Sequence, residues 1–420
     1  NSGFSVGLIN IKQPTHKDYN SVFWFNILMG GSLYLLLVAC APIIAWYYNE
    51  PRLTSLCRYA FLTVVMSSMG TAQSAYLTKN MKVKEMAKTG MTAVLVSSIV
   101  GVSMAYFGMG YWALASQSIV FIGMNSLLLW VFSDWRPTFE FDFSPIKRMF
   151  RFSVKMLATN IINQVNNNVL NILLGKYYST TATGYYNQAY QWNFKLFSLV
   201  QGMLYQVTQP MLVSLREEPG RQLNALRKLI RFTAFLSFPL LLGFGLVSTE
   251  FISVTITDKW LPAAKLIKIL CVGGAVMPLH TALSYMVITK GRSDINFWCT
   301  IGLGLVEMLI MITIWQLGIT TMVVAYTSIN VVWVLVWHFF VRRLTGYSLL
   351  HLLMDTVPFA LAAFGVMALC YVATMSITNN WLLLAARIPM AVVLYFAVMK
   401  MARVKILDEC LQFAKRKVKH

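Results

Sequence analysis

The stretch SVFWFNILMGGSLYLLLVACAPIIAWYY, Ser21–Tyr48, contains no charged side chain. A helix needs about 20 mostly apolar residues to cross roughly 30 Å of hydrocarbon, so this stretch is long enough to span a membrane. Outward from it, similar apolar runs follow one another through the 420 residues. The sequence therefore predicts an all-α polytopic membrane protein with twelve transmembrane helices: Ser21–Tyr48, Leu56–Leu77, Ala87–Phe107, Tyr111–Phe132, Met156–Leu174, Thr183–Leu212, Leu229–Val247, Ala263–Ile288, Phe297–Leu317, Thr321–Val341, Thr356–Met375 and Trp381–Met399.

The composition excludes the common soluble classes. Hydrophobic residues make up 57% of the chain and charged residues only 12%. A soluble domain would carry roughly 25% charged residues, and a disordered chain would combine low hydrophobicity with high charge.

The net charge of +20 would suggest nucleic acid in a soluble protein, so the positions of the basic residues decide its meaning. Of the 35 Lys and Arg, 27 fall on one set of alternate loops and 6 on the other, with Lys195 and Arg387 inside spans. Basic residues hold loops on the cytoplasmic side, so both ends of the chain are expected to be cytoplasmic. The excess also favours contact with anionic membrane lipids, and no nucleic-acid partner is expected.

One cytoplasmic connection, FEFDFSPIKRMFRFSVK at 139–155, predicts an amphipathic interfacial helix that begins near Ser144 and Pro145. It would join two bundles of helices. The expected organisation is a helical lobe with four spans at 1–133, the joint at 134–155, a second lobe with six spans at 156–341, and two C-terminal spans with a basic cytoplasmic tail at 342–420.

Two successive spans carry polar stripes, which are costly in hydrocarbon. Offsets of 0, 4, 7 and 11 in the fifth span, and of 0, 4, 8 and 18 in the sixth, place these residues on one helix face each. Interhelical hydrogen bonds would explain one or two amides, whereas a water-filled vestibule explains two whole stripes better. Amides and tyrosines also hydrogen-bond sugar hydroxyls, so the predicted substrate-binding residues are Asn160, Gln164, Asn167, Asn171, Asn187, Gln191, Lys195 and Tyr205.

Lys195 and Glu307 each allow two interpretations, whereas Arg387 and His280 are each given one. Lys195 would attract a phosphate, or it would reach the outer interface if its helix starts late. Glu307 is either an ion-coupling site for a proton or cation, or a buried partner of another side chain. Arg387 is expected to anchor the outer interface, and His280, two residues after Pro278, predicts a broken helix rather than a metal site.

Catalytic motifs are missing from the sequence. No P-loop, HExxH or Cys/His cluster occurs. Glu140 and Asp142 form an E-x-D pair that lacks a nucleotide-sugar domain around it. We therefore expect no enzyme, no cofactor and no metal, and the residues alone indicate a transporter with a polar cavity.

Several stretches resemble the Wzx-type lipopolysaccharide and exopolysaccharide flippases, which move lipid-linked oligosaccharides and belong to the multidrug/oligosaccharidyl-lipid/polysaccharide exporter superfamily. They include NSGFSVGLI at 1–9, QPTHKDYNSVFWFNILMG at 13–30, FGMGYWALASQ at 107–117 and ITKGRSD at 288–294. The resemblance extends to about Gly346. It implies a fourteen-helix exporter with two six-helix lobes and two further helices, so the chain is expected to lack the first two helices.

The resemblance also implies a function. Such proteins translocate an undecaprenyl-pyrophosphate-linked oligosaccharide across the bacterial cytoplasmic (inner) membrane by alternating access, for O-antigen, capsule or exopolysaccharide synthesis. The implied partners are that polyprenyl-pyrophosphate-linked oligosaccharide, membrane lipids and the polysaccharide polymerase machinery. The alternatives are a cation-coupled drug antiporter of the same fold, which would depend on intramembrane carboxylates, and a membrane glycan polymerase, which would show a larger outer loop.

Overall fold

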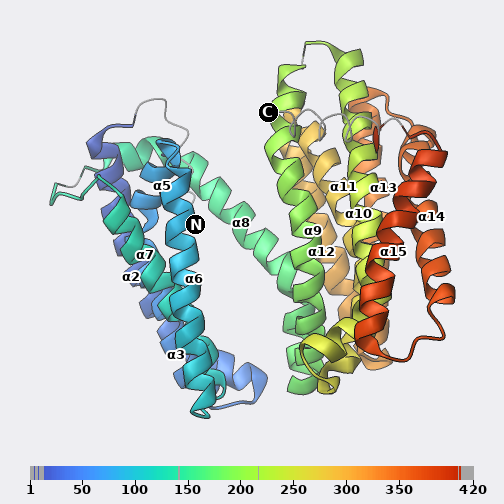
Figure 1. The fold of residues 1–420 in the computed structure, drawn as a ribbon. Coiled ribbons are helices and arrows are strands. Elements are labelled where there is room, and N and C mark those ends of the chain that lie inside the picture. Colours follow the sequence, from blue (N-terminus) through green and yellow to red (C-terminus); the bar gives the residue numbers. More distant parts are fainter. Residues whose placement is uncertain are drawn as a thin grey trace. The chain divides into compact units, whose positions relative to one another are not determined.

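The computed structural model describes residues 14–140, 142–215 and 217–404, together with Phe4, Leu8, Ile406 and Leu407. Every regular element in these ranges is a helix (Figure 1), which confirms the expected all-α class. The chain divides into two compact units, Asn1–Ile162 and Asn163–His420. Each unit is described by itself.

The first unit contains the helices from α2 to α7 and the beginning of α8. Helix α2 packs on the short helices α3, α4 and α5, while α6 packs on α7. Its core is small and aromatic, with Tyr19, Phe23 and Trp135 buried together. The bounds are α2 His16–Tyr48, α3 Leu53–Ala60, α4 Leu62–Met69, α5 Thr71–Lys79, α6 Val83–Tyr106 and α7 Tyr111–Phe132.

The expected span Leu56–Leu77 is not one continuous helix, because interruptions at Phe61 and Gly70 divide it among α3, α4 and α5. Such breaks release backbone carbonyls that water cannot satisfy within a membrane. Two side chains of α7 satisfy them: Ser126 Oγ donates to the Met66 carbonyl at 2.8 Å, and Trp130 Nε1 donates to the Met69 carbonyl at 2.8 Å. The broken span is therefore stabilised by its neighbour.

Helix α8, Ser144–Tyr177, is a single helix that continues from the expected joint into the expected fifth span. Its start matches the expected position, where the Ser144 backbone N–H and hydroxyl both donate to Asp142 Oδ1 at 2.9 Å. Ile146 is buried, whereas Phe150 and Val154 are exposed. The boundary expected at 155–156 lies within this helix, and the division into four segments stays a prediction.

The second unit is built around α11, which packs against α9, α10 and α13. The two C-terminal helices pack on α10, so they share this unit with the preceding helices (Figure 1). Helix α11 runs without interruption past Pro278, so the break expected at Pro278 and His280 is wrong. The bounds are α9 Thr180–Ser214, α10 Pro219–Thr255, η1 Asp258–Trp260, α11 Leu261–Thr289, α12 Ser293–Ile314, η2 Trp315–Leu317, α13 Ile319–Thr345, α14 Leu349–Ala373 and α15 Asn380–Met401.

Within the described ranges, nine helices are long and apolar enough to cross a membrane, and each coincides with an expected span. The other three expected spans fall on α3–α5, α8 and α9. Helices α8 and α9 are 34 and 35 residues long, but their amides lower the apolar character. The total of twelve spans stays a prediction.

Close helix packing in the second unit depends on two glycines. A Cβ at Gly304 of α12 would overlap the side-chain amide of Asn166 on α8, and one at Gly274 of α11 would overlap that of Asn193 on α9. Asn166 Nδ2 also donates to the Thr300 carbonyl at 2.8 Å. Small residues thus let polar side chains reach the backbone of a neighbouring helix.

We predict that Gly304→Ala lowers stability by about 1–3 kcal/mol, because the added methyl group overpacks the contact with Asn166. The melting temperature of the purified protein in detergent should fall, and Asn166→Ala in the same chain should recover part of the loss. Gly365→Ala is the control, since that glycine of α14 has open space around it. An unchanged melting temperature for Gly304→Ala would contradict the packing argument.

Candidate functional site

Helix α9 has a buried side and an exposed polar side. Tyr186, Ala189 and Phe197 lie in the core of the second unit. The predicted site residues Asn187, Gln191 and Lys195 are all exposed, each four residues from the next. The structure therefore places these three on one accessible face of a helix whose opposite face is packed.

Lys195 lies near the middle of α9, which begins at Thr180 rather than late. Its ammonium nitrogen lies 4.4 Å from the ring centroid of Trp192. Such a contact holds a cation over an aromatic face without neutralising it. The Lys195 charge thus remains available to an anion on the polar face.

Helix α8 contributes a second group of amides. Gln164 and Asn167 are exposed, and Asn171 is half-buried with an Oδ1 atom that accepts no hydrogen bond from a described residue. The predicted residues Asn160 and Tyr205 lie within α8 and α9, but their side chains fall outside the described part of the structure. The substrate-binding role of the two stripes stays a prediction.

Glu307 of α12 is buried, with 2% of its surface exposed. Asn330 of α13 donates to Glu307 Oε1 at 2.8 Å and to the Tyr326 carbonyl at 2.9 Å. The Asn330 carbonyl lies 2.9 Å from His280 Nε2. Within the described part of the chain, Glu307 forms no ion pair, so its carboxylate is held by an amide rather than by a cation.

A small cavity of about 10 Å³ lies beside this network, between α9, α11 and α13. Its lining includes Asn193, Thr327 and Asn330. Asn193 Oδ1 and Thr327 Oγ1 are buried, and neither has a hydrogen-bond partner among the described residues. Unpaired buried oxygens are rare because they are costly, and oxygens are the ligands that hard cations prefer.

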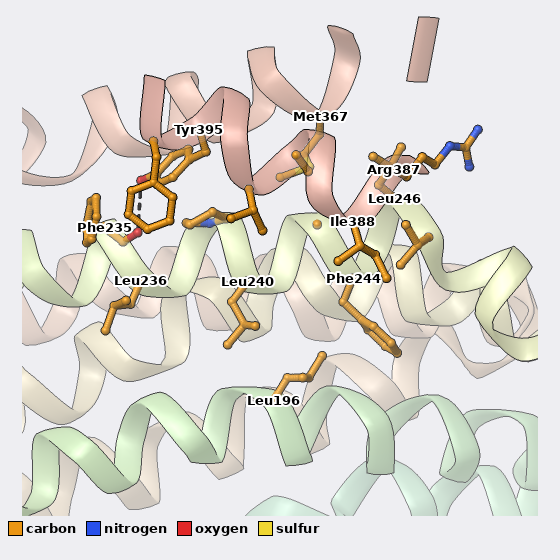
Figure 2. A pocket seen from close by; sticks show the side chains of 16 residues that line it. Leu196, Phe235, Leu236, Leu240, Phe244, Leu246, Met367, Arg387, Ile388 and Tyr395 are labelled. Carbon is orange, nitrogen blue, oxygen red and sulfur yellow. Dashed lines mark hydrogen bonds between the residues drawn. The ribbon is translucent and has the colours of Figure 1, made fainter. Parts of the chain in front are cut away.

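A larger and almost wholly apolar pocket of about 350 Å³ lies along α10, between α9 and the two C-terminal helices. Figure 2 shows Leu236, Leu240 and Phe244 pointing from α10 toward Leu196 of α9, with Tyr395 on the other side of α10. Leu196 directly follows Lys195 in the sequence. The apolar pocket thus reaches the helix that carries the exposed polar face.

Arg387 lies at one end of this pocket, with its guanidinium directed away from the apolar side chains (Figure 2). Its Nη1 donates to Glu250 Oε1 at 2.7 Å and its Nε to Thr374 Oγ1 at 2.9 Å. The Arg387 side chain is only 5% exposed. The expectation of an interface anchor is therefore wrong, because the side chain is instead half of a buried ion pair.

Sequence reasoning missed the partners of these buried groups. Asn330, Asn193 and Glu250 were not singled out, although each is a polar residue within or beside an apolar run. That position in the sequence is a signal of an interior contact. It does not name the partner, because Glu250 and Arg387 are far apart in the chain.

Many apolar helices, a polar helix face and buried polar networks define the class of polytopic helical membrane proteins. The chain belongs to the polysaccharide biosynthesis protein family, whose model matches residues 1–265. This confirms the family to which the quoted stretches pointed.

The chain is also similar to individual proteins. It is 26% identical to the teichuronic acid biosynthesis protein TuaB of Bacillus subtilis (strain 168), over 87% of this chain and 77% of that protein. It is 24% identical to the lipopolysaccharide biosynthesis protein WzxC of Escherichia coli (strain K12), over 70% and 60%. It is 23% identical to the succinoglycan biosynthesis transport protein ExoT of Rhizobium meliloti (strain 1021), over 85% and 71%.

One solved structure shares the fold. The lipid II flippase MurJ, in an inward closed conformation, matches with a TM-score of 0.73 at 15% identity. The match covers 96% of this chain and 90% of that chain. At this identity, the likeness establishes the fold alone.

We predict that Arg387→Met destabilises the protein by about 3–5 kcal/mol, because it leaves the Glu250 carboxylate buried and unpaired. Unfolding in detergent, followed by tryptophan fluorescence, measures the loss. Adding Glu250→Gln should recover most of it. The control is Arg292→Met, which breaks an exposed pair with Asp294 and should leave stability nearly unchanged; equal losses would contradict the argument.

Proposed function

We propose that the chain translocates a lipid-linked oligosaccharide across the bacterial cytoplasmic membrane by alternating access, for the synthesis of a surface polysaccharide. Membership of the polysaccharide biosynthesis protein family and the roles of relatives in polysaccharide biosynthesis and transport support this proposal. The cargo class is an oligosaccharide joined to a polyprenyl chain through pyrophosphate. Such a cargo needs three different surfaces, for sugar, phosphate and hydrocarbon.

The exposed polar face of α9 carries the proposal. Asn187 and Gln191 offer uncharged donors and acceptors to sugar hydroxyls, and Lys195 offers a cation to the pyrophosphate. Gln164 and Asn167 of α8 extend the same chemistry, and Asn160, Asn171 and Tyr205 belong to the same proposed set.

The apolar pocket suits the polyprenyl chain. Its lining is almost entirely hydrocarbon, and it meets α9 at Leu196, beside Lys195. Consecutive residues of a helix point in directions about 100° apart and differ by only about 1.5 Å along its axis. Lys195 and Leu196 therefore face different surroundings at almost the same depth in the membrane. A lipid could therefore place its chain in the pocket while its pyrophosphate contacts Lys195.

The orientation follows from charge. With 27 basic residues on one set of loops, both ends of the chain are proposed to be cytoplasmic. We further propose the four-part organisation, with lobes at 1–133 and 156–341 joined at 134–155 and followed by 342–420, and an interaction with the polysaccharide polymerase machinery that receives the product.

We predict that Lys195→Ala reduces translocation at least tenfold, because the pyrophosphate loses its cation, whereas Lys195→Arg retains most activity. Transfer of radiolabelled lipid-linked oligosaccharide between leaflets of proteoliposomes measures this. Lys265→Ala, which removes an exposed lysine of α11, is the control. No leaflet transfer by the unaltered protein would refute the proposed function, and full activity of Lys195→Ala would remove that residue from the site.

Glu307 is proposed to couple translocation to an ion gradient. A buried carboxylate without a cationic partner is suited to take up a proton or a small cation, and the orphan oxygens of Asn193 and Thr327 lie beside its partner Asn330. This carboxylate is also the feature that favours the alternative function, a cation-coupled drug antiporter.

We predict that Glu307→Gln abolishes the acceleration of transport by an imposed ion gradient, because the amide cannot exchange a charge. Initial rates in proteoliposomes with a proton gradient, a sodium gradient or neither separate the two ions. The control Asn168→Ala removes a side chain whose one hydrogen bond to a described residue lies within α8, to the Gln164 carbonyl. A gradient response that survives in Glu307→Gln would contradict the coupling role. Transport of cationic drugs in place of glycolipid would favour the antiporter.

A further inference from the structure

A cluster of charged residues ties α10 to α14 at the predicted cytoplasmic end of the second unit. Asp355 of α14 is completely buried. Arg227 donates to its two oxygens at 2.9 and 3.2 Å, Arg231 donates to Oδ1, and the Tyr347 hydroxyl donates to Oδ2 at 3.0 Å. The carboxylate therefore has more donors than one ion pair would supply.

The cluster carries an excess of positive charge. Two guanidinium groups share one carboxylate, and neither forms another ion pair among the described residues. The side chains of Arg227 and Arg231 are 24% and 44% exposed. Each guanidinium has five N–H donors, of which Arg227 uses two and Arg231 one in bonds to described residues. Most of the donors therefore have no partner among the described residues, and the fork geometry suits phosphate.

This cluster lies one helical turn from the apolar pocket on α10, and on α14 it lies one turn from a ring that packs against the pocket residue Phe235. Arg231 precedes Phe235 by four residues on α10, and Asp355 precedes Phe359 by four on α14, so each pair shares a helix face. The ring of Phe235 lies 6.3 Å from that of Phe359 and 6.1 Å from that of Phe396. Phe235 and Phe396 line the pocket.

We propose that Arg227 and Arg231 form a docking site for the pyrophosphate of the polyprenyl carrier, with the first part of the carrier chain in the apolar pocket. This inference rests on the proposed function and adds a loading position to it. Asp355 and Tyr347 hold the two guanidinium groups in place and neutralise one of their charges. The remaining charge and the pocket together match an anionic head on a hydrocarbon chain.

The position of the pocket explains how loading leads to the polar face. At one end it lies a turn from Arg231, and along its length it contacts Leu196, next to Lys195. A carrier whose chain stays in the pocket can therefore pass its pyrophosphate from the arginine pair to Lys195. A phospholipid headgroup offers similar phosphate chemistry, but a phospholipid has two hydrocarbon chains and no sugar. The single chain and the oligosaccharide of the carrier therefore match the pocket and the proposed sugar-binding face better.

The test measures binding to the purified full chain in detergent by native mass spectrometry. The probes are undecaprenyl pyrophosphate, undecaprenol, phosphatidylglycerol and inorganic pyrophosphate. We expect Arg231→Gln to weaken binding of undecaprenyl pyrophosphate about tenfold and to leave undecaprenol binding unchanged. Arg231→Lys should retain part of the affinity, because it keeps the charge but loses the fork.

A control separates docking from folding. Arg221→Gln removes an exposed arginine of the same helix that pairs with Glu218, and its binding should equal that of the unaltered chain. A melting temperature for each variant shows that the fold is retained.

The outcomes are distinct. Unchanged affinity of a folded Arg231→Gln variant for undecaprenyl pyrophosphate would overturn the docking site. Equal displacement of the probe by phosphatidylglycerol would overturn it in favour of a general site for anionic lipids, and equal displacement by inorganic pyrophosphate would remove the pocket from it. If binding depends on Arg231 but the unaltered chain transfers no lipid between leaflets, the proposed function fails and the docking site stands. If the Arg231→Gln variant binds undecaprenyl pyrophosphate normally and also transfers lipid normally, the docking site fails and the proposed function stands.

Discussion

Within hydrocarbon, every backbone N–H and C=O must be bonded inside the protein, and this constraint governs both units. Long helices such as α10 meet most of it by themselves, and the Phe235 carbonyl, four residues before Pro239, accepts from the Tyr395 hydroxyl. Where the chain is interrupted, at α3–α5, side chains of α7 add hydrogen bonds through Ser126 and Trp130. The packing of α4 on α7 therefore stabilises the interrupted segment of the first unit.

The same constraint applies to polar side chains, and the second unit meets it in two ways. Buried Asp355 is paired with two arginines, and Glu250 is paired with Arg387. The half-buried amide of Asn166 donates to the Thr300 carbonyl of a neighbouring helix. Among the described residues, Glu307 departs from both patterns because its partner is an amide, and the buried oxygens of Asn193 and Thr327 have no partner. A change of charge at buried Glu307 would not be compensated by a paired cation, so it would disturb the contacts with neighbouring helices. The proposed ion coupling requires such an effect.

Hydropathy in the sequence predicted nine spans that coincide with long apolar helices of the described ranges, because helices that face lipid need apolar residues all along their length. The stripe of amides on α9 was also placed on an accessible face, since helical period alone determines which residues share a face. Long-range contacts could not be derived this way. Arg387 shows the limit: its position near a span end indicated an interface anchor, whereas Glu250, distant in sequence, determines its burial. At Pro278, the neighbours of α11 keep the helix continuous although the local sequence favours a break.

The arrangement of α9 relates this packing to transport. A helix that faced only lipid would be apolar all round, and one that faced only the core would expose no amides. Helix α9 packs one side into the core, exposes Asn187, Gln191 and Lys195 on another, and touches the apolar pocket through Leu196. The surfaces proposed for sugar, phosphate and hydrocarbon therefore adjoin at one helix, at nearly the depth of Lys195. The chain of an amphiphile can stay in hydrocarbon and its head can enter a polar environment only where a polar and an apolar surface adjoin. The head and the chain would therefore separate at the junction of Lys195 and Leu196.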